Sequence, residues 1–242
     1  MDKKTLDSNE TSVDLSPRFE QLGLVVRSQG NRGTCSVFTV IGALEYAFAN
    51  RMGKGNALSV EFLNWASHKA AERNADGAFF SELWDGYIKY GICAEEDMPY
   101  LPEFNPDLMP TESILKIALK IPNTINGHLQ LNWIKEWDVS TGLTDEQLGE
   151  IKRILMRQFP VCGGFRWPKE AHWEEGVLQM CPPSEVFDGH SVLLSGYRND
   201  EDQPGGGVFI IRNSGGNSRT GYLSYEYVKT YMNDAAWIEP VI

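Results

Sequence analysis

The chain is poor in the residues that build metal sites, disulfide frameworks and membrane spans. It has 242 residues but only four cysteines and four histidines, and its cysteines form no Cys-x-x-Cys pair. Neither a zinc knuckle nor a redox dithiol is therefore indicated, and we expect no metal and no cofactor. No apolar run is long enough to span a bilayer, and the first residues lack the hydrophobic core of a secretion signal. These absences predict an intracellular, cytoplasmic protein, although removal of a leader would leave the same sequence.

Positive charge is also scarce. Lys and Arg number 22 against 33 Asp and Glu, which gives a formal net charge of −11. This balance argues against a partner that is a nucleic acid or an anionic membrane. The hydrophobic content of 42% is ordinary for a globular protein, and the length suits one large domain or two small lobes that share a cleft. The oligomeric state is left open.

Apolar residues at helical spacing dominate the first half of the chain. We expect a flexible tail at Met1–Ser12, then a helix from Cys35 that ends between Asn50 and Gly53. Two further helices are predicted, one capped by Ser59 and one from Phe79 to Tyr90. The proline-rich stretch from residue 99 to residue 110 is too broken for regular structure.

The second half changes character. The segment Ile114–Ile121 could be a strand or a helix, and Thr144 with Gln147 forms a capping box that opens a helix through Phe159. Strands or extended segments are predicted at Pro160–Phe165, Ser191–Tyr197, Val208–Arg212, Tyr222–Tyr227 and Ala235–Ile238. Helices first and strands second predict an α+β protein with two lobes.

The most informative stretch runs from Gln29 to Phe38. Here a loop broken by Gly30 and Gly33 delivers Cys35 to the start of an apolar helix. Unpaired backbone N–H groups and the positive end of the helix dipole favour the thiolate form of such a cysteine, which is the nucleophilic form. The alternative is a buried structural cysteine, which is the commonest role of a free thiol.

A thiolate nucleophile needs a base and a group that orients the base. His68, His128 and His172 lie in polar surroundings and are interpreted as surface residues. His190 instead opens an apolar strand, which would fix the direction of its ring, and Asn213 ends the next strand. Taken singly, His190 could be a packing residue and Asn213 a turn residue.

Taken together, these segments resemble the papain-like cysteine peptidases. The chain matches the family's motifs in order along the sequence, from residue 13 to the C-terminus. The matching segments are Gln29–Ser36, the Tyr90–Tyr100 region, Gly189-His190-Ser191-Val192 continuing to Tyr197, and Asn213-Ser214-Gly215-Gly216. The resemblance implies a papain-like two-lobe fold in one domain, residues 13–242. In this fold a helical lobe (about 25–120) and a β-barrel-like lobe (about 121–242) enclose the active-site cleft.

The resemblance also implies a chemistry: a cysteine peptidase that hydrolyses peptide bonds of peptide or protein substrates. Cys35 would attack the carbonyl, His190 would protonate the leaving amine, and Asn213 would orient His190. The side-chain amide of Gln29 and the backbone N–H of Cys35 would stabilise the oxyanion. Gly77 would line the substrate-binding cleft, although Asp-Gly is also a generic turn.

Three departures from the family pattern bear on this interpretation. Arg32 stands where the family has a disulfide cysteine, Ser36 replaces the tryptophan after the nucleophile, and Gly215 replaces the tryptophan that shields the Asn–His hydrogen bond. Another aromatic residue, such as Trp237, could supply that shield. The missing tryptophans keep a peptide- or partner-binding protein with little turnover as an alternative, and a thioester-based acyl transferase is another. We also expect no inhibitory pro-segment of the family's usual kind, because the residues before Val13 are too few for one.

Overall fold

The structure is a computed structural model that describes residues 11–120, 129–216 and 219–241. Seven helices lie in these ranges. They are α1 (Ser16–Gln21), α2 (Cys35–Met52), α3 (Val60–Ala71), α4 (Phe80–Tyr90), α5 (Glu112–Ala118), α7 (Asp145–Met156) and α8 (Tyr225–Tyr231). All the long helices of the first half fall where the apolar periodicity predicts them.

Nine strands of the described ranges form one sheet. They are β1 (Ser12–Asp14), β2 (Leu129–Lys135), β3 (Val161–Pro168), β4 (Trp173–Glu174), β5 (Val177–Leu178), β6 (Val186–Asn199), β7 (Gly207–Arg212), β8 (Thr220–Ser224) and β9 (Met232–Pro240). Their order is β2-β9-β3-β6-β7-β8-β5-β4, and β1 pairs with β6 off this path. All pairs are antiparallel except β5 with β8. The sheet does not close into a barrel.

Helix ends follow the local chemistry of the sequence. The Ser59 side chain accepts a hydrogen bond from the backbone N–H of Phe62, and Thr144 with Gln147 forms the predicted capping box. Gly53 ends α2 at φ 73° and Gly91 ends α4 at φ 76°, a conformation in which a side chain would be strained. The start and stop residues that the sequence predicts are therefore confirmed at these ends.

Other boundaries differ from the sequence-based expectations. Within the segment Ile114–Ile121, residues up to Ala118 belong to helix α5, and Ile121 lies outside the described residues. The prediction of an extended segment at Tyr222–Tyr227 is wrong in its second half, because Ser224 caps helix α8 there. Helix α7 ends at Met156, before Phe159. The predicted tail Met1–Ser12 falls mostly outside the described residues, but Ser12 itself pairs with Arg198 in the sheet.

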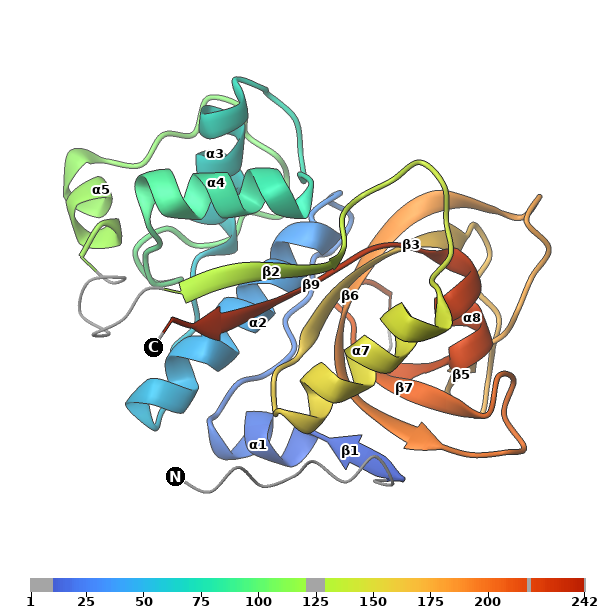
Figure 1. Cartoon of the computed structure of the whole chain (residues 1–242). Helices are drawn as coiled ribbons and strands as arrows, with labels where there is room; N and C mark the ends of the chain where they lie inside the picture. The colour runs from blue at the N-terminus through green and yellow to red at the C-terminus, as the bar shows by residue number, and fades with distance from the viewer. Residues whose placement is uncertain (1–10, 121–128, 217–218, 242) are drawn as a thin grey trace.

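Helix α2 lies at the centre of the molecule. It contacts strands β3, β6 and β9 on one side and helices α3 and α4 on the other (Figure 1). Its residues Val37, Val40, Ile41 and Leu44 are almost fully buried, as are Val161 of β3 and Val192 of β6. One core therefore joins the helical and β-rich halves, and the α+β class is confirmed. The proposed boundary near residue 120 stays a prediction, because residues 121–128, which include His128, lie outside the described residues.

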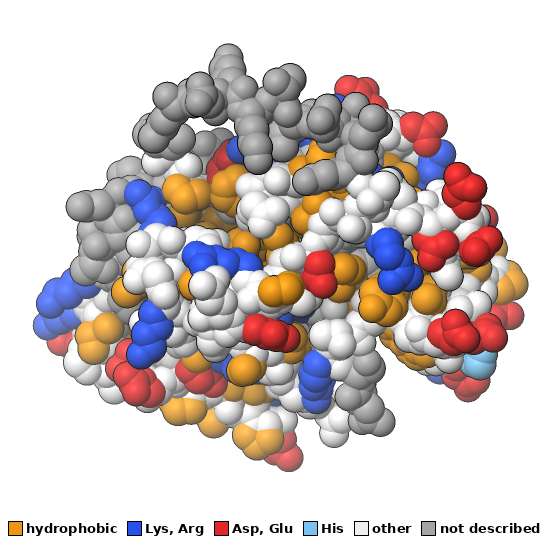
Figure 2. Space-filling model, turned by 90° about the horizontal axis from the view of Figure 1, so that it is seen from below, with side chains coloured by type: hydrophobic (Ala, Val, Ile, Leu, Met, Phe, Trp, Pro, Cys, Tyr) orange, Lys and Arg blue, Asp and Glu red, His pale blue; other side chains and the backbone are white. Residues whose placement is uncertain are grey.

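The surface carries charges of both signs. Figure 2, which looks at the molecule from below, shows acidic and basic side chains interspersed on that face, with hydrophobic patches between them. This face offers no continuous basic surface for a polyanion. No helix in the described part of the chain is long and apolar enough to cross a membrane.

The contact between α3 and α4 leads to a stability prediction. A Cβ added at Gly86 would stand 2.6 Å from the backbone nitrogen of Ser67 and 2.7 Å from the carbonyl carbon of Ala66, so Gly86→Ala must push the helices apart. We expect a loss of about 1–3 kcal/mol in the free energy of unfolding, measured by urea denaturation. Gly149→Ala on α7 is the matched control, because nothing lies within 4 Å of the added carbon. The control should gain about 0.5–1 kcal/mol, and equal effects of the two substitutions would contradict the close helix contact.

Candidate active site

Cys35 is the first residue of helix α2. Its backbone N–H belongs to the first turn, where no carbonyl of the helix is available to accept it. The N-cap residue Thr34 does not cap the helix with its side chain, because its hydroxyl bonds the hydroxyl of Tyr100 at 2.6 Å. The half-buried thiol therefore lies at the positive end of the α2 dipole, where no side chain caps the backbone N–H groups.

His190 on β6 and Asn213 after β7 meet beside the thiol. The Asn213 Oδ1 atom lies 2.8 Å from His190 Nε2 and also accepts the backbone N–H of Gly215 at 3.0 Å. Because that oxygen can only accept, Nε2 must carry a proton, which leaves Nδ1 to the sulfur of Cys35. Strand pairing of β6 with β3 and β7 holds both partners in place.

The thiol and the imidazole shift each other's pKa. Burial tends to raise the pKa of the Cys35 thiol, but the hydrogen bond and charge of His190 outweigh burial and lower it. Burial tends to lower the pKa of His190, but the hydrogen bond and charge of Cys35 raise it, with help from Asn213. The two groups thus favour a thiolate–imidazolium pair.

A tryptophan that the sequence analysis missed lies against His190. The ring centroids of Trp167 and His190 are 4.7 Å apart in an edge arrangement, and Trp167 comes from the neighbouring strand β3. A Cβ at Gly215 would stand 3.0 Å from His190 Cε1, so this glycine lies close against the ring. Trp237, the suggested replacement, is not the aromatic residue in contact with His190. The contact of Trp167 with His190 follows from the pairing register of β3 with β6, and this register cannot be read from the sequence.

Gln29 is tied to the Asn213 loop from the opposite side. Its backbone N–H donates to the carbonyl of Ser214 at 3.0 Å, and its Oε1 accepts the Ser214 hydroxyl at 2.8 Å. Its Nε2 donates one proton to the carbonyl of Arg32 at 2.9 Å. An amide nitrogen has two protons, and the second is free to point elsewhere. The structure therefore gathers Gln29, Cys35, His190 and Asn213 at one place.

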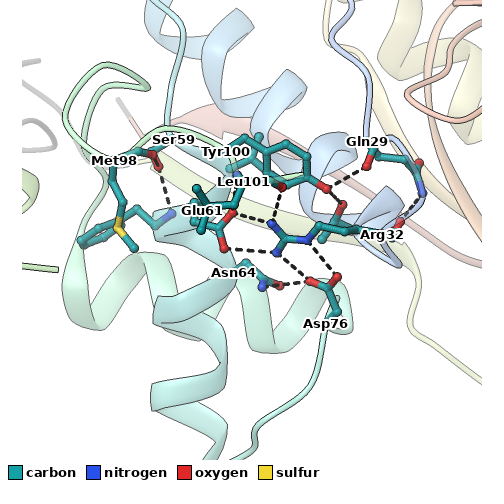
Figure 3. Close-up of polar contacts among 12 residues, drawn as sticks. Gln29, Arg32, Ser59, Glu61, Asn64, Asp76, Met98, Tyr100 and Leu101 are labelled. Atoms are coloured by element: carbon teal, nitrogen blue, oxygen red, sulfur yellow. Dashed lines mark hydrogen bonds and ion pairs between the residues drawn. The ribbon is translucent and has the colours of Figure 1, made fainter. Parts of the chain in front are cut away.

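The Arg32 guanidinium anchors the loop that carries Gln29 (Figure 3). Its five N–H groups all have acceptors: the two carboxylate oxygens of Glu61 at 2.5 and 3.1 Å, those of Asp76 at 2.9 and 3.0 Å, and the carbonyl of Leu101 at 2.9 Å. The side chains of Arg32 and Glu61 are 4% and 3% exposed. The Tyr100 ring lies 4.5 Å from the guanidinium carbon, and its hydroxyl donates to the carbonyl of Gln29 at 2.9 Å. The cluster thus reaches Gln29 directly.

Gly77 follows this cluster and lines the same cleft as Cys35 and His190. Its backbone N–H donates to Asn64 Oδ1 at 3.1 Å, and its carbonyl lies 3.1 Å from Nε2 of His68. The expectation of a surface His68 is therefore wrong: the side chain is buried because it holds this turn. A Cβ at Gly77 would stand 2.1 Å from the Gly33 carbonyl oxygen, so the turn packs directly on the loop before Cys35.

The cleft encloses about 310 Å³. It is lined from the helical side by Gly33, Cys35, Ser36, Arg73, Asp76, Gly77, Ala78, Phe79 and Phe80, and from the other side by Trp137, Gly164, Phe165, Gly189, His190, Ser191, Asn233 and Asp234. The sequence analysis did not single out Asp234, a carboxylate within a strand and only 5% exposed. Burial raises its pKa to about 7, against an opposing attraction from Lys135.

The Arg32 cluster predicts a large effect of removing its cation. Arg32→Met keeps the volume but leaves the carboxylates of Glu61 and Asp76 without their counter-ion, so we expect a loss of about 3–5 kcal/mol in the free energy of unfolding. Denaturant unfolding measures it. Arg153→Met is the control, since the ion pair of Arg153 with Glu150 is exposed and should contribute under about 1 kcal/mol. Similar losses in both variants would contradict the role given to the buried cluster.

Asp234 predicts a pH-dependent difference in stability. Its folded pKa lies above the usual value of about 4, so its protonated form stabilises the fold at low pH, and this stabilisation is lost as pH rises from about 4 to 7. Asp234→Asn removes the titration. The unfolding free energy of wild type relative to the variant should thus fall by about 3–4 kcal/mol over that range and then level off. Burial also raises the pKa of Glu45 to about 7, but Glu45 is present in both proteins, so its contribution cancels in the difference. A constant difference would contradict the burial of this carboxylate.

Comparisons with known proteins agree with the motifs and the geometry. The family profile described as "Papain family cysteine protease" matches residues 11–238. The chain is 27% identical over 229 residues to the thiol protease aleurain-like of Arabidopsis thaliana, a match that takes in 91% of this chain and 58% of that protein. Pro-cathepsin H of Medicago truncatula is 26% identical over 203 residues, which are 82% of this chain and 52% of that protein. The chain thus spans a little over half the length of these relatives.

Solved structures share the fold. Xylellain, a cysteine protease from Xylella fastidiosa, superposes with a TM-score of 0.72 at 20% identity, over 100% of this chain and 90% of that one. Digestive procathepsin L 3 of Tenebrio molitor larval midgut gives a TM-score of 0.66 at 20% identity, over 99% and 71% of the two chains. The papain-like fold is therefore confirmed. With the family profile covering nearly all of its residues, the chain belongs to the papain family of cysteine proteases.

Proposed function

We propose that the protein is a cysteine peptidase that hydrolyses peptide bonds, with Cys35 as nucleophile, His190 as acid and base, and Asn213 as the group that orients His190. The observation that carries the proposal is the contact of Cys35 with His190 at the N-terminus of α2, inside a cleft. The opposite pKa shifts of the two groups support it, because they keep the sulfur ionised and the imidazole protonated.

The proposed reaction has two halves, formation of a thioester with Cys35 and its hydrolysis, and His190 transfers a proton in each. The Cys35 sulfur attacks the carbonyl carbon, and the oxyanion takes hydrogen bonds from the backbone N–H of Cys35 and the second amide proton of Gln29. Each such donor contributes about 3–4 kcal/mol in comparable sites. His190 gives its proton to the leaving amine as the C–N bond breaks. His190 then takes a proton from water as the water oxygen attacks the thioester. The C–S bond breaks, the acid is released, and the thiolate–imidazolium pair is restored.

Two alternatives use the same site. A binding protein with little turnover would follow from the loss of the family's tryptophan next to Asn213, but the contact of Trp167 with His190 favours turnover because an aromatic edge still covers the ring. An acyl transferase would form the same thioester and pass the acyl group to an amine. Product masses with water alone, or with an added amine, distinguish hydrolysis from transfer.

A cytoplasmic location is the second part of the proposal. The loop before the nucleophile is held by the Arg32 ion pairs, and all four cysteines are free. Such a site keeps its geometry where thiols stay reduced, and the thiolate of Cys35 requires that condition for activity.

The lowered pKa of Cys35 predicts its alkylation profile. Because the thiolate survives to lower pH than in a free thiol, whose pKa is about 8.5, Cys35 should react with iodoacetamide at a lower pH than a free thiol does. Half-exposed Cys181 is the internal control: burial and Glu185 raise its pKa, so it should react at a higher pH than a free thiol does. Peptide mass spectrometry of protein alkylated from pH 5 to pH 9 measures both.

His190→Ala should move the Cys35 profile upward, toward that of a free thiol, because the variant loses the hydrogen bond and charge that favour the thiolate. Cys35→Ala should abolish peptide hydrolysis and labelling by an epoxide or vinyl-sulfone probe while leaving the fold intact. If Cys35 and Cys181 titrate together in the wild type, the thiolate–imidazolium pair and the proposed peptidase mechanism are both rejected.

A further inference from the structure

The carboxylate of Asp234 lies in the cleft opposite a glycine. Asp234 on β9 pairs with Gly164 on β3, and both residues line the cleft with Cys35 and His190. A Cβ at position 164 would stand 2.0 Å from Asp234 Oδ1. The missing side chain of Gly164 therefore creates the space that the carboxylate fills.

Asp234 is also the charge of the cleft that lacks an ion-pair partner. Arg73 pairs with Glu82 and Asp76 pairs with Arg32, whereas in the described ranges no salt bridge reaches Asp234. The backbone N–H of Gly164 donates a hydrogen bond to the carboxylate, and Lys135 attracts it. The Lys135 ammonium, however, donates to the carbonyls of Ser140, Gly142 and Met232. A buried carboxylate without a counter-ion is costly to ionise, and a cation that joins it offsets that cost.

We propose that Asp234 selects peptides with a basic side chain, arginine or lysine, which enters the cleft and pairs with this carboxylate. The inference rests on the proposed function, because it treats the cleft as the place where peptide binds. The cation of the substrate supplies the missing partner, and a charged hydrogen bond in a site shielded from water is stronger than one at the surface.

The rim of the cleft suits the rest of such a side chain. Phe79 and Trp137 come from the two sides of the cleft and touch each other, with ring centroids 5.0 Å apart, and they remain 44% and 50% exposed. The exposed part of this aromatic pair can pack against the apolar stem of lysine or arginine and attract its cation. The raised pKa of Asp234, about 7 without substrate, agrees with a carboxylate that becomes fully ionised only when a cation arrives.

The test measures binding to the Cys35→Ala protein, so that turnover is not required. The probes are pools of N-acetylated, C-amidated hexapeptides. In each pool one position is fixed as arginine or as its neutral isostere citrulline, and the other five positions are a mixture of alanine, leucine, serine and valine. Each of the six positions is fixed in turn. At one or more positions the arginine pool should bind about 10- to 100-fold more tightly. Adding Asp234→Asn should remove this preference. Asp85→Asn, the same chemical change on the exposed side of α4, should keep it.

Gly164→Ala gives a second, independent variant, because its methyl group displaces the Asp234 carboxylate without removing it; the arginine preference should shrink at least several-fold. Equal binding of arginine and citrulline pools to the Cys35→Ala parent overturns the proposal even if Asp234→Asn fails to fold. A preference that survives Asp234→Asn also overturns it. Matched citrulline pools with a free N-terminus are measured as well. If they bind tightly while the acetylated citrulline pools do not, the cation is amino-terminal and the side-chain assignment is rejected.

The same peptides separate this inference from the proposed function. Wild-type protein incubated with each pool is followed by product masses. An arginine preference in binding without cleavage supports the role of Asp234 and rejects the peptidase. Cleavage that depends on Cys35 but treats arginine and citrulline alike supports the peptidase and rejects the role of Asp234.

Discussion

One buried guanidinium holds the catalytic loop to the rest of the molecule. The Arg32 side chain ends between Glu61 on α3 and Asp76 in the following turn, and its N–H groups are all accepted (Figure 3). Three segments that are distant in the chain thus meet at a single cation. Burial alone would lower the pKa of that group, but the two carboxylates raise it, so it stays charged. The position of Gln29, of the Gly77 turn and of the start of α2 all follow from this arrangement.

The opposite half of the site depends on strand pairing. β6 delivers His190, Asn213 directly follows β7, and β3 supplies both Trp167 and Gly164. Because one core joins α2 to these strands, the thiol of Cys35 and the imidazole of His190 meet across the two halves of the molecule. The N-terminus of α2 favours the charged form of the Cys35 thiol, and the sheet fixes the positions of His190 and Asn213. The site needs both, since neither a lone thiol nor a lone imidazole would be held in its reactive form.

Sequence analysis could predict the elements and residues whose signals are local. Ser59, Thr144 and the terminal glycines mark helix ends by their own chemistry, and Cys35, His190 and Asn213 stand in recognisable motifs. Residues that act through distant partners could not be found in this way. The contact of Trp167 with His190 follows from strand register, and the burial of His68 follows from a turn nine residues away.

The Arg32 and Asp234 positions show the same limit more sharply. Replacement of a cysteine by Arg32 is visible in the sequence, but its two acceptors come from separate elements whose approach depends on the whole fold. Asp234 looks like any polar residue near the end of a chain until β9 places it against a glycine. The anchor at Arg32 has a further consequence for how the loop is made. A disulfide forms only when an electron acceptor oxidises its two thiols, whereas contact between a guanidinium and carboxylates needs no oxidant. The loop can therefore reach its final shape as the chain compacts and can return to it unaided after denaturation.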